Sequence, residues 1–201
     1  MSLAYPLAFS FGQTESTALL EPETLDAELL QEEEAEAERN RPGLTIFTDG
    51  LRLGDGATGY AVVWKKGLTW AGAKVHMGYN QEAYDAKCAA LAHALESTSR
   101  RNTTPERVTI FSDAQAATRR MASDEPGPRQ QYAIQARKHI VALRRPRPGI
   151  TIEIRWCLAH KGIVCNEKAD EWAKTAAGQP DTYRPLPRSL ANLKRKISEK
   201  K

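Results

Sequence analysis

The hydrophobic pattern changes period repeatedly between residues 44 and 177, and this alternation limits the folds that the chain can adopt. Short runs rich in β-branched and aromatic residues alternate with longer runs that carry apolar residues at helical spacing. In order, they predict three strands, a helix, a strand, two helices, a strand and a closing helix. The predicted strands cover 44–48, 59–64, 68–75, 107–111 and 150–156, and the predicted helices cover 82–95, 115–122, 129–143 and 166–177. This order favours an α/β domain, a mixed sheet with helices on its faces.

Three aspartates occupy positions at which a sheet could bring them together. Asp49 and Asp113 each follow a predicted strand, and Asp170 lies inside the last predicted helix. In open α/β sheets the usual site is the crevice at the carboxyl ends of the strands. Carboxylates that converge there are stable around a divalent cation, and hard oxygen ligands select Mg²⁺ or Mn²⁺. A plainer interpretation stays open, in which Asp49 belongs to an ordinary Asp-Gly turn and Asp113 caps the following helix.

Three stretches resemble, in the same order, the signature motifs of type 1 ribonuclease H. They are Ile46–Gly50, Ile110–Asp113 and Trp156–Asp170, and the last contains a His loop followed by Asn-Glu-x-x-Asp. The resemblance covers Leu44 to about Ala177. Two further segments, Glu82–Ala86 and Leu186–Leu190, look most like the ribonuclease H domain of non-LTR retrotransposon polyproteins. That resemblance implies a reverse transcriptase domain upstream.

The resemblance implies a ribonuclease H-like fold, with a five-stranded mixed sheet flanked by helices. It also implies an endoribonuclease that hydrolyses the RNA strand of RNA–DNA hybrids, with two Mg²⁺ (or Mn²⁺) ions held by four carboxylates. Asp49 would bridge both ions, Asp113 and Asp170 would each help to hold one, and His160 would assist proton transfer or product release. The hybrid would be recognised by minor-groove shape, 2′-hydroxyl groups and phosphates, not by base identity.

The chain departs from the family at the second carboxylate. The family places a glutamate at the start of the first helix, and Lys87 occupies that position here. Three carboxylates and one ammonium carry a charge of −2, which matches about one Mg²⁺ instead of two. We therefore expect metal occupancy and cleavage to be severely reduced. The alternative to an active ribonuclease is a catalytically inactive domain that still binds nucleic acid.

Two nearby acids could in principle replace the missing glutamate. Asp85 lies two residues before Lys87 and Glu82 lies five before it. Two residues correspond to about 200° around a helix, which is the wrong face. Replacement by Asp85 would therefore require an irregular first turn.

Charge divides the chain into an acidic leader and a basic body. Residues 1–41 contain ten acidic and two basic residues, a balance of −8, so a net charge of +4 leaves +12 for the remainder. A basic body suggests a polyanionic partner, although a merely solvated surface would look the same. We expect a leader or linker over 1–42 with a helix at 23–39, a ribonuclease H-like domain over 43–178 and a basic tail over 179–201.

The tail and the cysteines complete the expectations. Leu190, Leu193 and Ile197 stand at helical spacing among lysines and arginines, which fits either a basic helix that touches nucleic acid or a solvated tail. Three cysteines without CxxC spacing indicate reduced thiols and no zinc site. The longest uncharged stretch, residues 1–14, is shorter than the roughly 20 apolar residues of a membrane span. We expect an intracellular protein, nuclear or cytoplasmic, that is monomeric and has no membrane partner.

Overall fold

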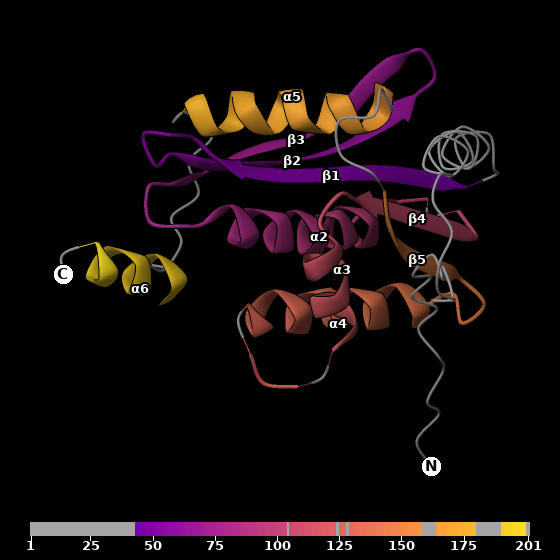
Figure 1. Ribbon diagram of the computed structural model, residues 1–201. Helices are drawn as coiled ribbons and strands as arrows, with labels where there is room; N and C mark the ends of the chain where they lie inside the picture. The colour runs from indigo at the N-terminus through magenta and orange to yellow at the C-terminus, as the bar shows by residue number, and fades with distance from the viewer. Residues whose placement is uncertain are drawn as a thin grey trace, which may run out of the picture.

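The computed structural model describes residues 43–103, 105–123, 125–127, 129–157, 164–179 and 190–199. These residues form one central sheet with helices on both of its faces (Figure 1). The leader helix expected at 23–39 lies outside the described residues. Of the helices that are described, none is long and apolar enough to cross a membrane.

The sheet has five strands in the order β3-β2-β1-β4-β5. Strand β1 pairs antiparallel with β2 and parallel with β4, and β4 pairs parallel with β5, so the sheet is mixed as expected. The strand bounds are β1 Leu44–Arg52, β2 Thr58–Lys66, β3 Thr69–Gly78, β4 Arg107–Ser112 and β5 Thr151–Trp156. Strands β2 and β3 form a hairpin that turns at Gly67, whose φ of +63° is a conformation that glycine adopts without strain.

The helices divide between the two faces of the sheet. Their bounds are α2 Ala83–Ser99, α3 Gln115–Ala122, α4 Gln130–Arg144, α5 Val164–Gly178 and α6 Leu190–Ser198. Side chains alternate along a strand, so Ile46 joins the core under α2 and α4, and the next residue, Phe47, joins the core under α5. Figure 1 shows α5 on one side of the sheet and α2 and α4 on the other.

Helix α2 lies unusually close to β1 because both elements present small residues. Ala86, Ala90 and Ala94 are fully buried on the face of α2 that meets the sheet. A Cβ built on Gly50 would lie 2.5 Å from the carbonyl carbon of Ala86 and 2.6 Å from the nitrogen of Lys87, so a side chain there would clash. This close contact fixes the position of the Lys87 backbone relative to β1.

Strand β1 is longer than the sequence pattern predicts. The expected end was Thr48, but β1 continues through Asp49 and Gly50 to Arg52 because β2 goes on pairing with it. The parallel ladder with β4 does stop at Thr48, opposite Ser112. Asp49 therefore lies within a strand and not in an Asp-Gly turn, directly past the point where the parallel neighbour ends.

Candidate active site at the end of the parallel strands

The end of β4 and the first turns of α2 place three of the five predicted site residues together. Asp49 comes from β1, Asp113 directly follows β4, and Lys87 projects from α2. The Nε1 of Trp156, the last residue of β5, donates to the backbone carbonyl of Asp113 at 3.0 Å and so holds the backbone on which Asp113 sits.

The ammonium of Lys87 joins the two carboxylates. Its Nζ lies 2.7 Å from Oδ1 of Asp49 and 2.6 Å from Oδ1 of Asp113. Both distances are those of charge-assisted hydrogen bonds. Asp49 is 5% exposed, and the side chain of Lys87 is 21% exposed. The acids predicted to share a metal ion therefore share a lysine.

Burial and charge act against each other on this group. Burial raises the pKa of Asp49 to about 6, against the attraction of Lys87 and with the help of the like charge on Asp113. Burial alone would lower the pKa of Lys87, but the carboxylates of Asp49 and Asp113 outweigh it and hold that pKa above its ordinary value. Lys87 therefore stays an ammonium at neutral pH, and its Nζ lies between the two carboxylates.

Asp170 is directed to a different partner. It projects from α5, and its Oδ2 accepts a hydrogen bond from Nζ of Lys174, one turn later, at 2.5 Å. Helix α5 packs on β1 and β2. His160 lies outside the described residues.

Neither nearby acid replaces the missing glutamate. Asp85 is fully buried, accepts a hydrogen bond from the backbone nitrogen of Glu82 at 2.6 Å, and is ion-paired with Arg129. Glu82 accepts hydrogen bonds from Asn192 and Arg195 in α6. The helical-face argument against Asp85 thus agrees with the structure. Both acids are bonded to other partners, Asp85 to Arg129 and Glu82 to α6.

The partner of Asp85 is Arg129, which no feature of the sequence indicates. Arg129 immediately precedes α4 and has φ +62°, the only non-glycine with positive φ among the described residues. Its side chain is 7% exposed in contact with a carboxylate at 0%. An arginine after the segment 124–128, which contains Pro and Gly, carries no sequence signal for this conformation, because helix starts favour Ser, Thr, Asp or Asn.

The side chains as they lie do not fit a pair of Mg²⁺ ions. The ammonium occupies the position where oxygens of Asp49 and Asp113 converge, and Asp170 faces Lys174. Within the described ranges, no group of three or more Asp, Glu, His or Cys side chains is arranged to hold a metal ion. Two unit charges about 4 Å apart interact by about 4 kcal/mol at an effective dielectric near 20. The repulsion between a divalent cation and the ammonium of Lys87 would be twice as large at that distance, so the ammonium opposes binding of the ion.

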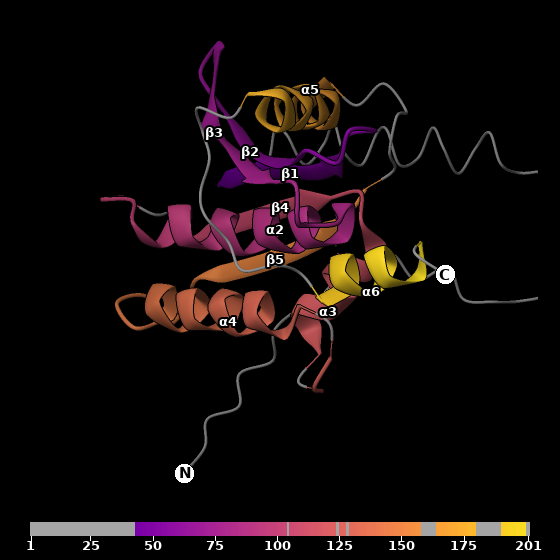
Figure 2. The same ribbon diagram turned by 90° about the vertical axis from the view of Figure 1, so that its left-hand side faces the viewer.

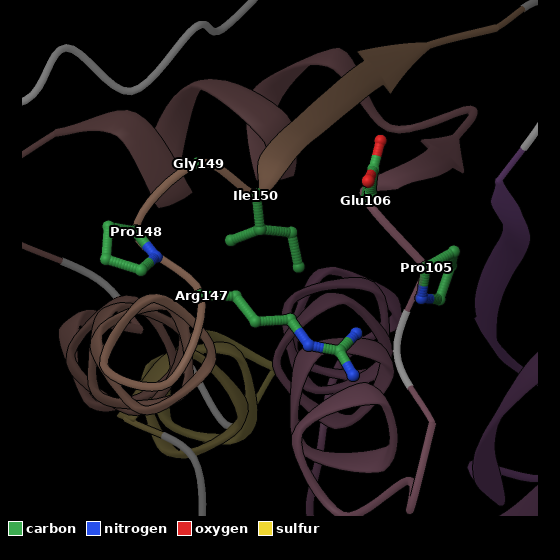
Figure 3. A pocket seen from close by; sticks show the side chains of 6 residues that line it. All are labelled: Pro105, Glu106, Arg147, Pro148, Gly149 and Ile150. Carbon is green, nitrogen blue, oxygen red and sulfur yellow. The ribbon is translucent and has the colours of Figure 1, made fainter.

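A separate hollow lies at the opposite end of the parallel strands. It has a volume of about 660 Å³ and is lined by Pro105 and Glu106 before β4 and by residues 147–150 before β5. Figure 3 shows Arg147 reaching from the Pro148 side toward Pro105. Because it lies at the amino ends of β4 and β5, this hollow does not adjoin Asp113 at the carboxyl end of β4.

The sequence matches a known family. The model of the RNase H family matches residues 41–178, and the chain belongs to that family. No curated protein matches the sequence.

Solved structures of the same family share the fold. The RNase H1 of the archaeon Halobacterium salinarum superposes with a TM-score of 0.51 at 18% identity, covering 67% of this chain and 97% of that one. The N-terminal RNase H domain of Rv2228c from Mycobacterium tuberculosis gives 0.53 at 20% identity, covering 67% and 98%. LC11-RNase H1, isolated from compost, gives 0.51 at 20% identity, covering 69% and 97%. These likenesses confirm the predicted fold.

Proposed function

We propose that this chain binds RNA–DNA hybrids through its ribonuclease H fold and that its hydrolysis of the RNA strand is severely reduced. Family membership supports the substrate class. The observation that carries the reduced hydrolysis is the ammonium of Lys87, which lies within 2.7 Å of both Asp49 and Asp113.

Binding and hydrolysis depend on different parts of the surface. A hybrid is held mainly by contacts to phosphates and 2′-hydroxyl groups along its groove, and such contacts need cations and hydrogen-bond donors. The net charge of +12 on residues 42–201 supplies the cations. Lys87 replaces one acid without removing any of them, so hybrid binding is retained while the carboxylate set is not.

The decisive experiment compares this chain with Lys87→Glu. Cleavage of an end-labelled hybrid in Mg²⁺ is measured together with hybrid binding in EDTA. We expect Lys87→Glu to cleave at least 100-fold faster, the size of effect typical of one electrostatic group at a reacting centre. Binding should change by less than the cleavage rate does.

Lys87→Gln is the matched control, because it removes the ammonium without supplying a carboxylate. If cleavage needs the carboxylate that is missing at position 87, Lys87→Gln should cleave about as slowly as this chain. If only the ammonium obstructs the site, Lys87→Gln should cleave about as fast as Lys87→Glu. Equal cleavage by this chain and Lys87→Glu would refute the proposed reduction.

The alternative is a fully active hybrid endoribonuclease, which the family match favours. It would use Asp49, Asp113, Asp170 and His160 in the roles that the resemblance implies. It requires Lys87 to leave both carboxylates and Asp170 to leave Lys174 when the substrate is bound. The same cleavage assay separates the two proposals.

A retroelement origin is a further part of the proposal. It is supported by the segments Glu82–Ala86 and Leu186–Leu190, which look most like the ribonuclease H domain of non-LTR retrotransposons, and by the acidic leader. Sequencing the DNA upstream of this coding region tests it. A reverse transcriptase reading frame in phase with residue 1 is expected, and an unrelated gene there would contradict it.

A further inference from the structure

The last described helix, α6, is held in a defined orientation although it lies beyond residue 178, where the family match ends. The side chain of Asn192 is fully buried, and its Nδ2 donates to Oε1 of Glu82 at 3.0 Å. Nε of Arg195 donates to the same oxygen at 3.0 Å, and Nζ of Lys196 donates to Oδ1 of Asn80 at 3.2 Å. Helix α6 is therefore docked against the start of α2.

That contact places α6 beside the candidate active site. Glu82, the residue immediately before α2, precedes Lys87 by five residues, which is about 7.5 Å along the helix axis. Figure 1 shows α6 at the end where α2 begins, and Figure 2, viewed from that end, shows α6 in the foreground. The end of β1 reaches the same place, because Nε of Arg52 lies 4.0 Å from Oε2 of Glu82.

The outward side of this region is cationic. Lys194 and Lys196 are exposed, and neither forms an ion pair with a carboxylate in the part of the chain that the structure describes. Arg52 is a quarter exposed, and Tyr79, which comes just before Asn80, is 54% exposed. We call Lys196 together with Arg52 the α6 surface, since both lie beside the start of α2. Lys194 comes two residues before Lys196 and therefore projects from the opposite side of α6.

We propose that the α6 surface binds the phosphate backbone of a hybrid seated at the candidate active site and extends the binding surface beyond the family's own domain. This inference rests on the proposed hybrid binding. A duplex carries one negative charge per about 1.7 Å of its axis, so about nine charges fall within 15 Å of any point along one direction. A duplex that reaches Asp113 and Lys87 therefore places phosphates near α6, where Arg52 and Lys196 displace condensed counterions.

The test is the salt dependence of hybrid binding by the full chain. Affinity for a fluorescent RNA–DNA hybrid is measured in EDTA at several salt concentrations, for this chain and for Arg52→Gln/Lys196→Gln. If Arg52 and Lys196 each contact one phosphate, the slope of log affinity against log salt becomes shallower by about 1.8. Lys65→Gln/Lys66→Gln is the matched control, since these exposed lysines sit on the β2–β3 hairpin at the other end of β2 and should leave the slope unchanged.

Each outcome has a separate meaning. A shallower slope for the α6 pair alone supports the inference. Equal slopes for the α6 pair, the hairpin pair and this chain overturn the inference and leave hybrid binding intact. Absence of hybrid binding by this chain itself overturns the proposed function, and the inference with it. A second variant, Asn192→Leu, removes one of the two hydrogen bonds that join α6 to Glu82 and so loosens its docking. It should make the slope shallower with Arg52 and Lys196 retained.

Discussion

At the scale of single residues, Lys87 has a role in stability that is independent of any reaction. Asp49 is almost fully buried, and Asp113 is 10% exposed, so their charges have little access to water. The ammonium is their shared counterion. Removing one partner of a buried ion pair leaves an uncompensated charge, which destabilises proteins by about 3–5 kcal/mol.

We therefore predict that Lys87→Met lowers the free energy of unfolding by about 3 kcal/mol at pH 7, measured by urea denaturation. Adding Asp113→Asn to this variant should recover a large part of the loss, because only one buried carboxylate then remains. Lys66→Met, at an exposed hairpin position, should change stability by less than about 0.5 kcal/mol. Equal unfolding midpoints for Lys87→Met and this chain would contradict the prediction.

Arg129 combines an ion pair with an unfavourable backbone conformation, and the two can be separated by substitution. Arg129→Ala removes the partner of buried Asp85 and keeps a side chain at φ +62°, so we expect a loss of about 3–5 kcal/mol. Arg129→Gly removes the same partner but tolerates positive φ, so its loss should be about 1 kcal/mol smaller. Thermal and urea unfolding of both variants test the order. A glycine variant less stable than the alanine variant would show that φ is not a constraint there.

At the scale of elements, the sequence patterns predicted every described strand and helix of the domain in the right order, including the mixed sheet. The spacing of apolar residues is enough to predict these elements, because each strand or helix buries one face. They failed at the end of β1, since whether a strand stops at Asp49 depends on the length of β2, its antiparallel neighbour. They could not place α6 against Glu82 or pair Arg129 with Asp85, because those contacts join residues 110 and 44 positions apart.

The docking of α6 should depend on pH through Glu82. Burial works against ionisation, but hydrogen bonds from Arg195 and Asn192 and the charge of Arg195 and Arg52 prevail and lower the pKa of Glu82 below its ordinary 4.5. The folded state thus holds this proton less tightly than the unfolded state. The stabilisation is complete above pH 4.5 and is lost as the pH falls through the lower folded pKa.

We expect this acid loss to be at most about 1 kcal/mol, because Glu82 is partly exposed and solvent screens its charges. Urea denaturation between pH 6 and pH 3 measures it, and Glu82→Gln should already show the loss at pH 6 and vary less below it. Glu125→Gln, at an exposed position, should keep the acid dependence of this chain. An unchanged acid dependence in Glu82→Gln would exclude Glu82 as its source.

At the scale of the whole molecule, the lysine-bridged site predicts a fold whose stability does not depend on divalent ions. The melting temperature of this chain should be the same in Mg²⁺ and in EDTA. Lys87→Glu should be less stable in EDTA, because three acids then face one another, and should gain about 2.7 kcal/mol when Mg²⁺ reaches 100 times its Kd. Calorimetry in the two buffers provides the measurement. A fall in the melting temperature of this chain on adding EDTA would show that it holds a metal after all.

The tight contact between Gly50 and the backbone of α2 has an evolutionary consequence. It involves the main-chain atoms of Ala86 and Lys87 and does not depend on which side chain follows. Lysine and glutamate codons differ in their first base alone, so one point mutation exchanges the two without disturbing how the helix meets the strand. A lineage carrying such a gene can therefore lose nuclease activity and regain it by reversion, because the packing of α2 on β1 is the same with either residue.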